Sequence, residues 1–341
     1  MRVLVTGATG VIGTEVAQRL RALPGAQVTA TARRAPAGDT VAWHIGQEPP
    51  LPPLEGPWDV IVHTAASTRW TMSRDEALDA NVGVLRAILG LAGPGTHLVH
   101  LSTAYVGGQR NRSDLRGEEF EGYRNGYEWS KAVCEQVILE EHRGPTTIVR
   151  PPLVVGRRTD GRIARFTGPY TIFSTMVSGL APAVVGDPDG YTEISPVDDV
   201  ADVVAATVLG GPPAEPRTEV IAGGRQSLRL SEMIDTTCRT VNKFRAEHGV
   251  APIGVPPIVS IDSWDRFFLP LSRNWLSPTQ QQVVDLLGMF YSYTSMTVPF
   301  EPTYPVRDAA SVLATTVWHW AGSNPRQALA EPKPWRLPAT S

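Results

Sequence analysis

The chain has 341 residues, of which 42% are hydrophobic and 19% are charged, ordinary values for a globular protein with a large core. The formal net charge of -3 gives no general attraction to nucleic acid or to an anionic membrane, so we expect neither as a partner. Two cysteines cannot build a disulfide framework, and we find no signal peptide and no apolar run long enough to span a bilayer; the cytoplasm is therefore the expected location.

The N-terminus combines a short apolar strand with a glycine-rich turn. Glycines follow the strand at positions 7, 10 and 13, and an apolar stripe at near-helical spacing comes next. Such glycines allow a sharp turn, close approach of the backbone to a pyrophosphate, and close packing of the helix on the strand. We predict that a dinucleotide binds here, at Gly7, Thr9, Gly10, Val11, Ile12 and Gly13. A glycine-rich turn without a ligand is the alternative.

The next apolar segment, residues 27–32, ends at Arg33 and Arg34. A site that selects NAD usually has an acidic residue here for the ribose hydroxyls, and such a carboxylate would repel a 2′-phosphate. Guanidinium groups instead bind phosphate through paired hydrogen bonds. The two arginines therefore favour NADPH over NADH, with Arg33 the better candidate, and a solvated basic turn is the alternative.

Apolar segments of strand length alternate with helical patterns through the first half of the chain. The predicted strands are residues 2–6, 27–32, 58–62, 97–102 and 146–150. This alternation predicts an α/β fold, a Rossmann-type doubly wound parallel sheet covered by helices on both faces. Ligands bind such sheets at the carboxyl ends of the strands.

Tyr127 and Lys131 lie four residues apart in a segment with a helical pattern. Residues at this spacing share a face of a helix, so we expect the Lys131 ammonium to lie beside the Tyr127 phenol. A neighbouring positive charge lowers the pKa of a phenol from its free value of about 10. Tyr127 is therefore a candidate proton donor near neutral pH.

These motifs resemble those of the extended short-chain dehydrogenases/reductases over most of the chain. The matching segments are the Gly-x-x-Gly-x-x-Gly turn, Asp59 to Ala66, Asn81 to Gly83, His100 to Val106, Tyr127 to Lys131, and Arg150 to Gly156. Within that superfamily the sequence is most similar to thioester reductase domains and fatty acyl-CoA reductases of the male-sterility type. Ser-Thr-Ala-Tyr-Val at 102–106, Asn-Gly-Tyr at 125–127 and Trp70 carry this narrower resemblance.

The resemblance implies roles for several residues. It implies that the backbone at His63, Ala65 and Ala66 borders the cofactor, and that Pro151 and Leu153 flank the nicotinamide.

It also implies a catalytic set of Thr103, Tyr127 and Lys131, in which Thr103 orients the substrate carbonyl and Lys131 holds the ribose. Asn81 would support this site. Ser102 remains the alternative to Thr103 because a shift of one residue would exchange them.

The reaction expected from these parts is hydride transfer from NADPH to an acyl thioester bound to a carrier protein or to CoA. Tyr127 would give its proton to the developing oxyanion, and the product would be an aldehyde or an alcohol. Adenylation and carrier domains are absent from this sequence, so we expect a stand-alone, trans-acting reductase. One alternative is a reductase or dehydrogenase of a free ketone, alcohol or sugar nucleotide; another is a non-catalytic NAD(P)-sensing protein.

Histidine pairs with metal-ligand spacing are absent from the sequence, so no metal site is predicted. His63 and His100 fall in or beside predicted strands, and we expect both to be packed, hydrogen-bonded core residues.

The predicted dinucleotide-binding domain is discontinuous, comprising residues 1–155 plus about 193–222, because a helix at 198–204 and a strand at 219–222 follow later in the chain. Residues of about 156–192 plus 223–330 are expected to form a smaller, mostly helical substrate lobe. Residues 331–341 are expected to be a loose tail.

Two features of the expected substrate lobe suggest contacts with a substrate. The first is the arginine cluster Arg157, Arg158, Arg162 and Arg165, which could receive a phosphopantetheine phosphate or the acidic face of an acyl carrier protein; a solvated loop is the alternative. The second is an apolar, aromatic region that could line an acyl pocket or form the core of the lobe, comprising Trp264, Phe267, Phe268, Leu269, Leu271, Trp275, Leu286, Leu287, Met289, Phe290 and Tyr291.

Overall fold

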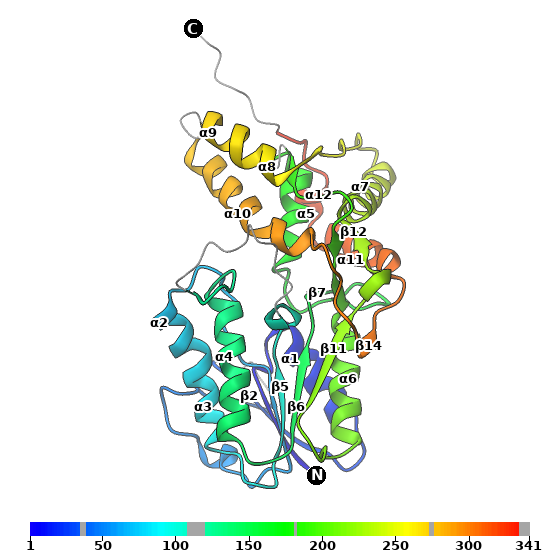
Figure 1. Cartoon of the computed structure of the whole chain (residues 1–341). Helices are drawn as coiled ribbons and strands as arrows, with labels where there is room; N and C mark the ends of the chain where they lie inside the picture. Colours follow the sequence, from blue (N-terminus) through cyan, green and yellow to red (C-terminus); the bar gives the residue numbers. More distant parts are fainter. Residues whose placement is uncertain (35–38, 108–119, 181–182, 273–275, 334–341) are drawn as a thin grey trace. The chain divides into compact units, whose positions relative to one another are not determined.

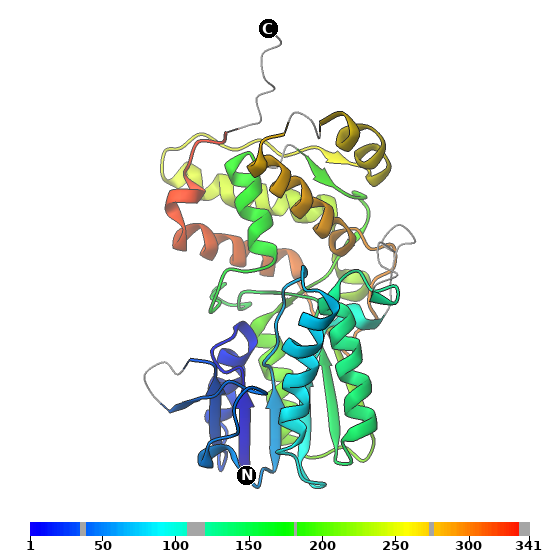
Figure 2. The same ribbon diagram turned by 90° about the vertical axis from the view of Figure 1, so that its left-hand side faces the viewer.

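The computed structural model describes residues 1–34, 39–107, 120–180, 183–272 and 276–333. The chain forms two compact units, shown in Figures 1 and 2. The first unit comprises Met1–Pro152, Val197–Ala222 and Glu301–Pro305, and the second comprises Leu153–Pro196, Gly223–Phe300 and Val306–Ser341.

The first unit is built on a parallel sheet of eight strands with the order β14-β11-β6-β5-β4-β1-β2-β3. The strands are β1 (Arg2–Thr6), β2 (Gln27–Ala32), β3 (Thr40–Ala42), β4 (Val60–His63), β5 (His97–Leu101), β6 (Thr146–Arg150), β11 (Arg217–Ala222) and β14 (Tyr304–Pro305). Their order reverses between β1 and β4, the position at which doubly wound sheets open a ligand crevice. This arrangement confirms the predicted fold class.

Helices cover both faces of this sheet (Figures 1 and 2). α3 and α4 lie on one face, and α1 and α6 pack together on the other. The helical elements of the unit are α1 (Val11–Arg21), α2 (Arg74–Ala77), α3 (Val84–Leu89), α4 (Gly126–Glu141), α6 (Val197–Leu209), and the shorter turns η1 (Pro52–Leu54), η2 (Leu78–Gly83, π-helical) and η3 (Ala104–Gly107).

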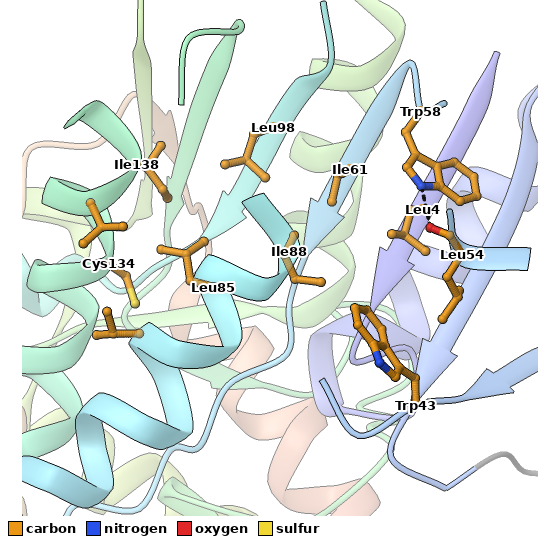
Figure 3. Close-up of a cluster of buried hydrophobic side chains, with 12 residues drawn as sticks. Leu4, Trp43, Leu54, Trp58, Ile61, Leu85, Ile88, Leu98, Cys134 and Ile138 are labelled. Carbon is orange, nitrogen blue, oxygen red and sulfur yellow. Dashed lines mark hydrogen bonds between the residues drawn. The ribbon is translucent and has the colours of Figure 1, made fainter. Parts of the chain in front are cut away.

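The core between the sheet and α3 and α4 is made of alternate strand residues and the inner faces of the two helices (Figure 3). It includes Leu4, Ile61, Leu98, Leu85, Ile88, Cys134 and Ile138. Burying one such aliphatic side chain stabilises the fold by about 2 kcal/mol. Trp58 closes one end, where its indole N–H donates to the Leu54 carbonyl oxygen at 3.1 Å. This packing fixes α4, and with it Tyr127 and Lys131, against the sheet.

Two sheet strands lie outside the predicted set. β3 has only three residues and β14 only two, too few to show a periodic pattern. Tyr304 and Pro305 pair with Ile221 and Ala222, and this pairing puts residues 301–305 in the first unit, whereas we expected them in the substrate lobe. Conversely, residues 153–155 and 193–196 lie in the second unit, because they pair with each other as β7 (Leu153–Val155) and β10 (Ile194–Pro196).

The second unit is mostly helical. Its helical elements are α5 (Pro169–Ser178), η6 (Gly224–Gln226), α7 (Leu230–Glu247), α8 (Ile261–Ser263), η7 (Trp264–Phe268, π-helical), α9 (Leu269–Ser272), α10 (Pro278–Thr294), α11 (Ala309–Ser323) and α12 (Pro325–Ala328). Three two-stranded ladders join its loops: β7 with β10, β8 (Val184–Val185) with β13 (Ile258–Val259), and β9 (Tyr191–Thr192) with β12 (Leu228–Arg229).

The aromatic region of this unit forms a hydrophobic core. Trp264 is buried and stacks on Phe268 with ring centroids 4.1 Å apart, and Leu287 and Tyr291 pack into the same cluster. Phe267 is the exception, because 62% of it is exposed. These contacts favour the core alternative over an acyl pocket. Trp275 lies outside the described residues, as do the side chains of Leu271 and Leu286.

The expected loose tail is described only at its start. The Lys333 backbone N–H donates to the Ser178 carbonyl oxygen at 2.8 Å, so residue 333 is attached to the end of α5. Residues 334–341 lie outside the described residues. Among the helices that the structure describes, none combines the length and the apolar character needed to cross a membrane.

Candidate active site

The glycine turn joins β1 to α1 at the reversal point of the sheet. Gly7 has φ +68°, a conformation that favours glycine, and a Cβ at this position would lie 2.8 Å from the Ala65 backbone. A Cβ on Gly13 would lie 2.1 Å from the Gly7 carbonyl oxygen. The turn therefore tolerates only glycine at these two positions, and it brings Gly7 beside Ala65 after β4.

The N-terminus of α1 has the features of a phosphate site. Gly10 is its N-cap residue and provides no side-chain cap, and the first turn contains no acidic residue. The backbone N–H groups of Val11 and Ile12 belong to this first turn, where a helix leaves donors without intrahelical partners. Together with the helix dipole, such donors favour an anion, so the residues present fit the pyrophosphate of a dinucleotide.

Arg33 and Arg34 are both exposed and directly follow the buried end of β2. They stand at the carboxyl edge of the strand next to β1, where the adenosine ribose of a dinucleotide is held in folds of this kind. Acidic residues are absent from β2 and from both arginine positions. This position thus carries basic side chains where NAD-selective sites of this fold usually carry an acidic one.

Three interactions tie the turn after β4 to the turn after β1. Thr6 Oγ1 is 2.7 Å from His63 Nδ1, the Ala65 N–H points at Thr6 Oγ1 at 3.4 Å, and Thr64 Oγ1 donates to the Thr6 carbonyl oxygen at 2.6 Å. His63 is buried, and burial followed by the charge of Lys131 lowers its pKa from 6.5 to about 3. His63 is thus a neutral, hydrogen-bonded core residue, as expected. Ala66 continues this turn.

The start of α4 is fixed by two interactions. Asn125 Oδ1 accepts a hydrogen bond from the Glu128 N–H at 3.0 Å, which caps the helix. Arg124 Nε lies 2.9 Å from Glu128 Oε1 in a buried ion pair, and the Arg124 guanidinium lies over the Tyr105 ring, 4.8 Å from its centroid. Tyr127 directly precedes Glu128, so these interactions fix the turn of α4 that carries it. The pair of Arg124 and Glu128 was not predicted from the sequence, although opposite charges four residues apart indicate such a pair.

The structure brings Tyr127 and Thr103 together. The Thr103 side chain lies near enough to the Tyr127 phenol for hydrogen bonding to affect its pKa, whereas Ser102 Oγ is buried with no hydrogen-bond partner in the described part of the chain. Of the two neighbouring hydroxyls, Thr103 is therefore the one aligned with Tyr127.

The expected direction of the Tyr127 pKa is wrong for this structure. Burial raises the pKa above its usual value of 10, the charge of Glu128 adds to the rise, and the hydrogen bond with Thr103 opposes it. Desolvation penalises the phenolate more strongly than any nearby positive charge favours it. Tyr127 is consequently held in its protonated form, the form required of a proton donor.

Lys131 has a partner that its helical spacing does not reveal. Its ammonium Nζ lies 3.3 Å from Nε2 of His100, and both side chains are buried. Burial lowers the pKa of Lys131, while the nearby Cys134 and Glu135 raise it. His100 therefore contacts a candidate catalytic residue in addition to packing in the core.

Asn81 supports α4 through a small network. Its Nδ2 donates to Ser130 Oγ at 2.8 Å and to the Ser67 carbonyl oxygen at 3.1 Å, and its Oδ1 accepts from the Ser67 N–H at 2.7 Å. Ser130 Oγ in turn donates to the Tyr127 carbonyl oxygen at 2.9 Å. The amide thus connects the segment after β4 to the turn of α4 that carries Tyr127.

Pro151 follows β6 at the same edge of the sheet, and its carbonyl oxygen accepts from the Ala104 N–H at 3.0 Å. The segment after Thr103 is thereby attached to the strand expected to flank a nicotinamide. Leu153, expected to contact the same ring, is the first residue of the second unit and is buried.

Comparisons with known proteins agree with this geometry. Residues 54–204 match the family model described as male sterility protein. Fatty acyl-CoA reductase 1 of Xenopus laevis is 25% identical over 182 residues, which cover 43% of this chain and 35% of the relative; the chain thus spans about a third of that protein's length.

Two solved structures share the fold of the whole chain. The terminal R domain from the myxalamid PKS-NRPS biosynthetic pathway has a TM-score of 0.68 and 20% identity, with 97% of this chain and 92% of that chain covered. The thiolation-reductase di-domain from an archaeal non-ribosomal peptide synthetase has a TM-score of 0.63 and 16% identity, with 95% and 90% covered. The sheet order and the glycine turn agree with these comparisons. Residues 54–204 of the chain thus resemble the male sterility protein family, and the chain has the fold of these reductase domains.

Proposed function

We propose that this protein is an NADPH-dependent reductase of acyl thioesters, which it converts to aldehydes or alcohols. The observation that carries the proposal is the placement of Thr103 near the Tyr127 phenol, with Lys131 one helical turn further along α4, inside the region that matches the male-sterility family. The fold that the chain shares with the terminal R domain of the myxalamid pathway and with a thiolation-reductase di-domain supports a thioester substrate.

The residues that would hold the cofactor lie along the carboxyl edge of the sheet. Gly7, Thr9, Gly10, Val11, Ile12 and Gly13 would bind the pyrophosphate, Arg33 and Arg34 the 2′-phosphate, and Ala65, Ala66, His63, Pro151 and Leu153 would border the remainder. When bound, the reduced nicotinamide supplies the hydride. Lys131 would bind the ribose hydroxyls with its ammonium.

Two hydroxyl groups of the chain would bind the carbonyl oxygen of the substrate. The Thr103 and Tyr127 hydroxyls would both donate hydrogen bonds to it, which stabilises the negative charge that develops as the carbon is reduced. Tyr127 would then transfer its phenolic proton to that oxygen. The resulting hemithioacetal breaks its carbon–sulfur bond, its hydroxyl proton passes to the leaving sulfur, and an aldehyde and a free thiol are released.

The test is oxidation of NADPH, with NADH in parallel, against acyl-CoA and acyl-pantetheine thioesters, simple ketones, alcohols and sugar nucleotides. We expect NADPH loss with thioesters, together with release of the free thiol and an aldehyde that can be trapped. Turnover of ketones or sugar nucleotides without turnover of any thioester would refute the thioester assignment.

Cofactor preference is expected to depend on Arg33. In Arg33→Glu, KM for NADPH should rise roughly 10- to 100-fold, the effect of losing a hydrogen bond to a charged group, while KM for NADH should change little. Steady-state kinetics with both cofactors measures this. Arg143→Ser is the charge control, because Arg143 is exposed at the far end of α4 from Tyr127. Equal changes in both KM values would exclude a 2′-phosphate contact.

One loop of the second unit is a candidate surface for an acyl carrier protein. It contains the predicted arginine cluster of Arg157, Arg158, Arg162 and Arg165. The loop is closed by its backbone, since the Gly161 N–H donates to the Arg157 carbonyl oxygen at 2.8 Å and the Arg157 N–H to the Arg162 carbonyl oxygen at 2.9 Å. Arg158 donates to the Arg307 carbonyl oxygen at 2.7 Å, a contact that stabilises the chain. Arg162 and Arg165 are exposed, so we infer that these two arginines would meet the acidic face of a carrier.

The double variant Arg162→Ser, Arg165→Ser should raise KM for a carrier-bound acyl thioester roughly 5-fold or more, because each exposed ion pair contributes up to about 1 kcal/mol. KM for the same acyl group on pantetheine should not change. The control is Arg225→Ser, Arg326→Ser, which removes two exposed charges from other parts of the same unit. An equal rise in KM for both substrates, or an equal rise in the control variant, would show that these arginines do not bind a carrier.

A further inference from the structure

A buried histidine contacts the lysine of the candidate site. His100 is on β5 and fully buried, and its Nε2 lies 3.3 Å from Nζ of Lys131, a residue that is only 2% exposed. The His100 ring also stacks on the His63 ring, with centroids 5.3 Å apart and an interplanar angle of 30°. His63 Nδ1 in turn lies 2.7 Å from Oγ1 of Thr6, at the end of β1.

The chemistry of the two side chains determines which of them donates the hydrogen bond. A lysine ammonium has three donors and no acceptor, so the His100 nitrogen that faces it must offer a lone pair. His100 is then neutral and carries its proton on Nδ1. Burial, followed by the charges of Lys131 and His63, holds the pKa of His100 well below 6.5, which agrees with a neutral ring.

We propose that His100 is the positioning residue of Lys131, whose ammonium it orients by accepting a hydrogen bond at Nε2. The proposal rests on the role of Lys131 proposed above, but it does not depend on the substrate being a thioester. Three residues after His100, the same strand leads into Thr103, whose hydroxyl lies near the Tyr127 phenol. One strand thereby fixes both the carbonyl-binding hydroxyl and the lysine that follows Tyr127 on α4.

The groups that face this contact determine how it responds to pH. His63 faces His100 from β4, and Cys134 and Glu135 act on Lys131 from α4. Glu135 is itself paired with Arg150 at the end of β6. A hydrogen bond to the charged form of a base favours that form. Removal of the His100 acceptor must therefore lower the pKa of Lys131.

The experiment compares His100→Leu, His100→Gln and His97→Leu by titration of each protein with NADPH across pH. In His100→Leu, NADPH should bind about 10-fold more weakly at neutral pH, the effect of one hydrogen bond to a charged group. The loss of affinity on the alkaline side should begin at lower pH, because Lys131 loses its proton earlier. His100→Gln should restore both properties, since its side-chain oxygen can accept the same bond.

His97→Leu is the matched control for general damage to the core. His97 is buried on the same strand, and its Nε2 lies 3.0 Å from Thr147 Oγ1. The control should lower Tm by a similar amount to His100→Leu without moving the pH dependence of NADPH binding. An equal shift in both leucine variants, or no restoration by glutamine, would overturn the proposal.

The tautomer gives an independent check that needs neither substrate nor cofactor. In the protein labelled with ¹⁵N-histidine, the resonance lost in His100→Gln should show an unprotonated Nε2 and a protonated Nδ1. A proton on Nε2 would overturn the proposal. Absence of thioester reduction would leave both the titration and this spectrum unaffected, so the two failures can be told apart.

Discussion

In Tyr127→Phe, reduction is expected to be lost, with kcat lowered roughly 10²- to 10⁴-fold, the range for removal of a general acid. The phenol is the group in contact with Thr103, and burial keeps it protonated in the folded protein. Phenylalanine retains the ring and removes only the hydroxyl, so the dissociation constant for NADPH should not change. Rapid-mixing measurement of NADPH oxidation, with fluorescence titration of NADPH binding, gives both quantities.

Tyr123→Phe provides the control for this experiment. Tyr123 is a partly buried tyrosine four residues before Tyr127 and packs in the cluster around Met72 and Trp129. Its variant should retain wild-type turnover. Undiminished turnover in Tyr127→Phe would contradict the proposed proton donor, and undiminished cellular function without any turnover would indicate an NAD(P)-sensing protein.

The second large effect is expected for Gly13→Ala. A methyl group at this position would lie 2.1 Å from the Gly7 carbonyl oxygen and 2.7 Å from Thr64 Oγ1. Because the nearest obstacle is backbone, either the turn or α1 must move, at a cost of about 1–3 kcal/mol in the free energy of unfolding. The same movement displaces the backbone N–H groups at the start of α1, so NADPH binding should be lost. Calorimetric titration and chemical denaturation measure the two effects.

Gly322→Ala is the comparison for Gly13→Ala. Gly322 is an exposed residue of α11, and a Cβ there would meet nothing within 4 Å. Alanine is the better helix former by about 1 kcal/mol, so this variant should be neutral or slightly more stable. Wild-type NADPH affinity in Gly13→Ala would contradict the phosphate site proposed at α1.

Long apolar segments allowed most of the first unit to be predicted from the sequence. β1, β2, β5 and β6 begin at the predicted residues, because parallel strands buried on both faces are continuous runs of apolar and β-branched residues. β14 could not be found in this way. A segment of two residues shows no periodic pattern. Tyr304–Pro305 is a strand only because it pairs with β11, which lies about 80 residues earlier in the chain.

The candidate site, too, could be predicted only in part from the sequence. Motif and spacing indicated Thr103, Tyr127 and Lys131, and a helix does carry Tyr127 and Lys131. The pKa of Tyr127 was predicted in the wrong direction because desolvation depends on how α4 packs against the sheet, which local spacing does not contain. The partner of Lys131 was missed for a related reason. His100 is 31 residues away in the sequence and has the alternation of an ordinary core residue.

The most direct test of hydride transfer to a thioester carbonyl uses NADPH deuterated at the transferring position. An acyl-pantetheine thioester is reduced in the presence of an aldehyde-trapping amine, and the trapped product and the free thiol are quantified by mass spectrometry. We expect one deuterium on the former carbonyl carbon and release of one free thiol for each aldehyde formed. Consumption of NADPH without a labelled aldehyde, or an aldehyde formed without release of thiol, would show that the protein does not reduce thioesters in this way.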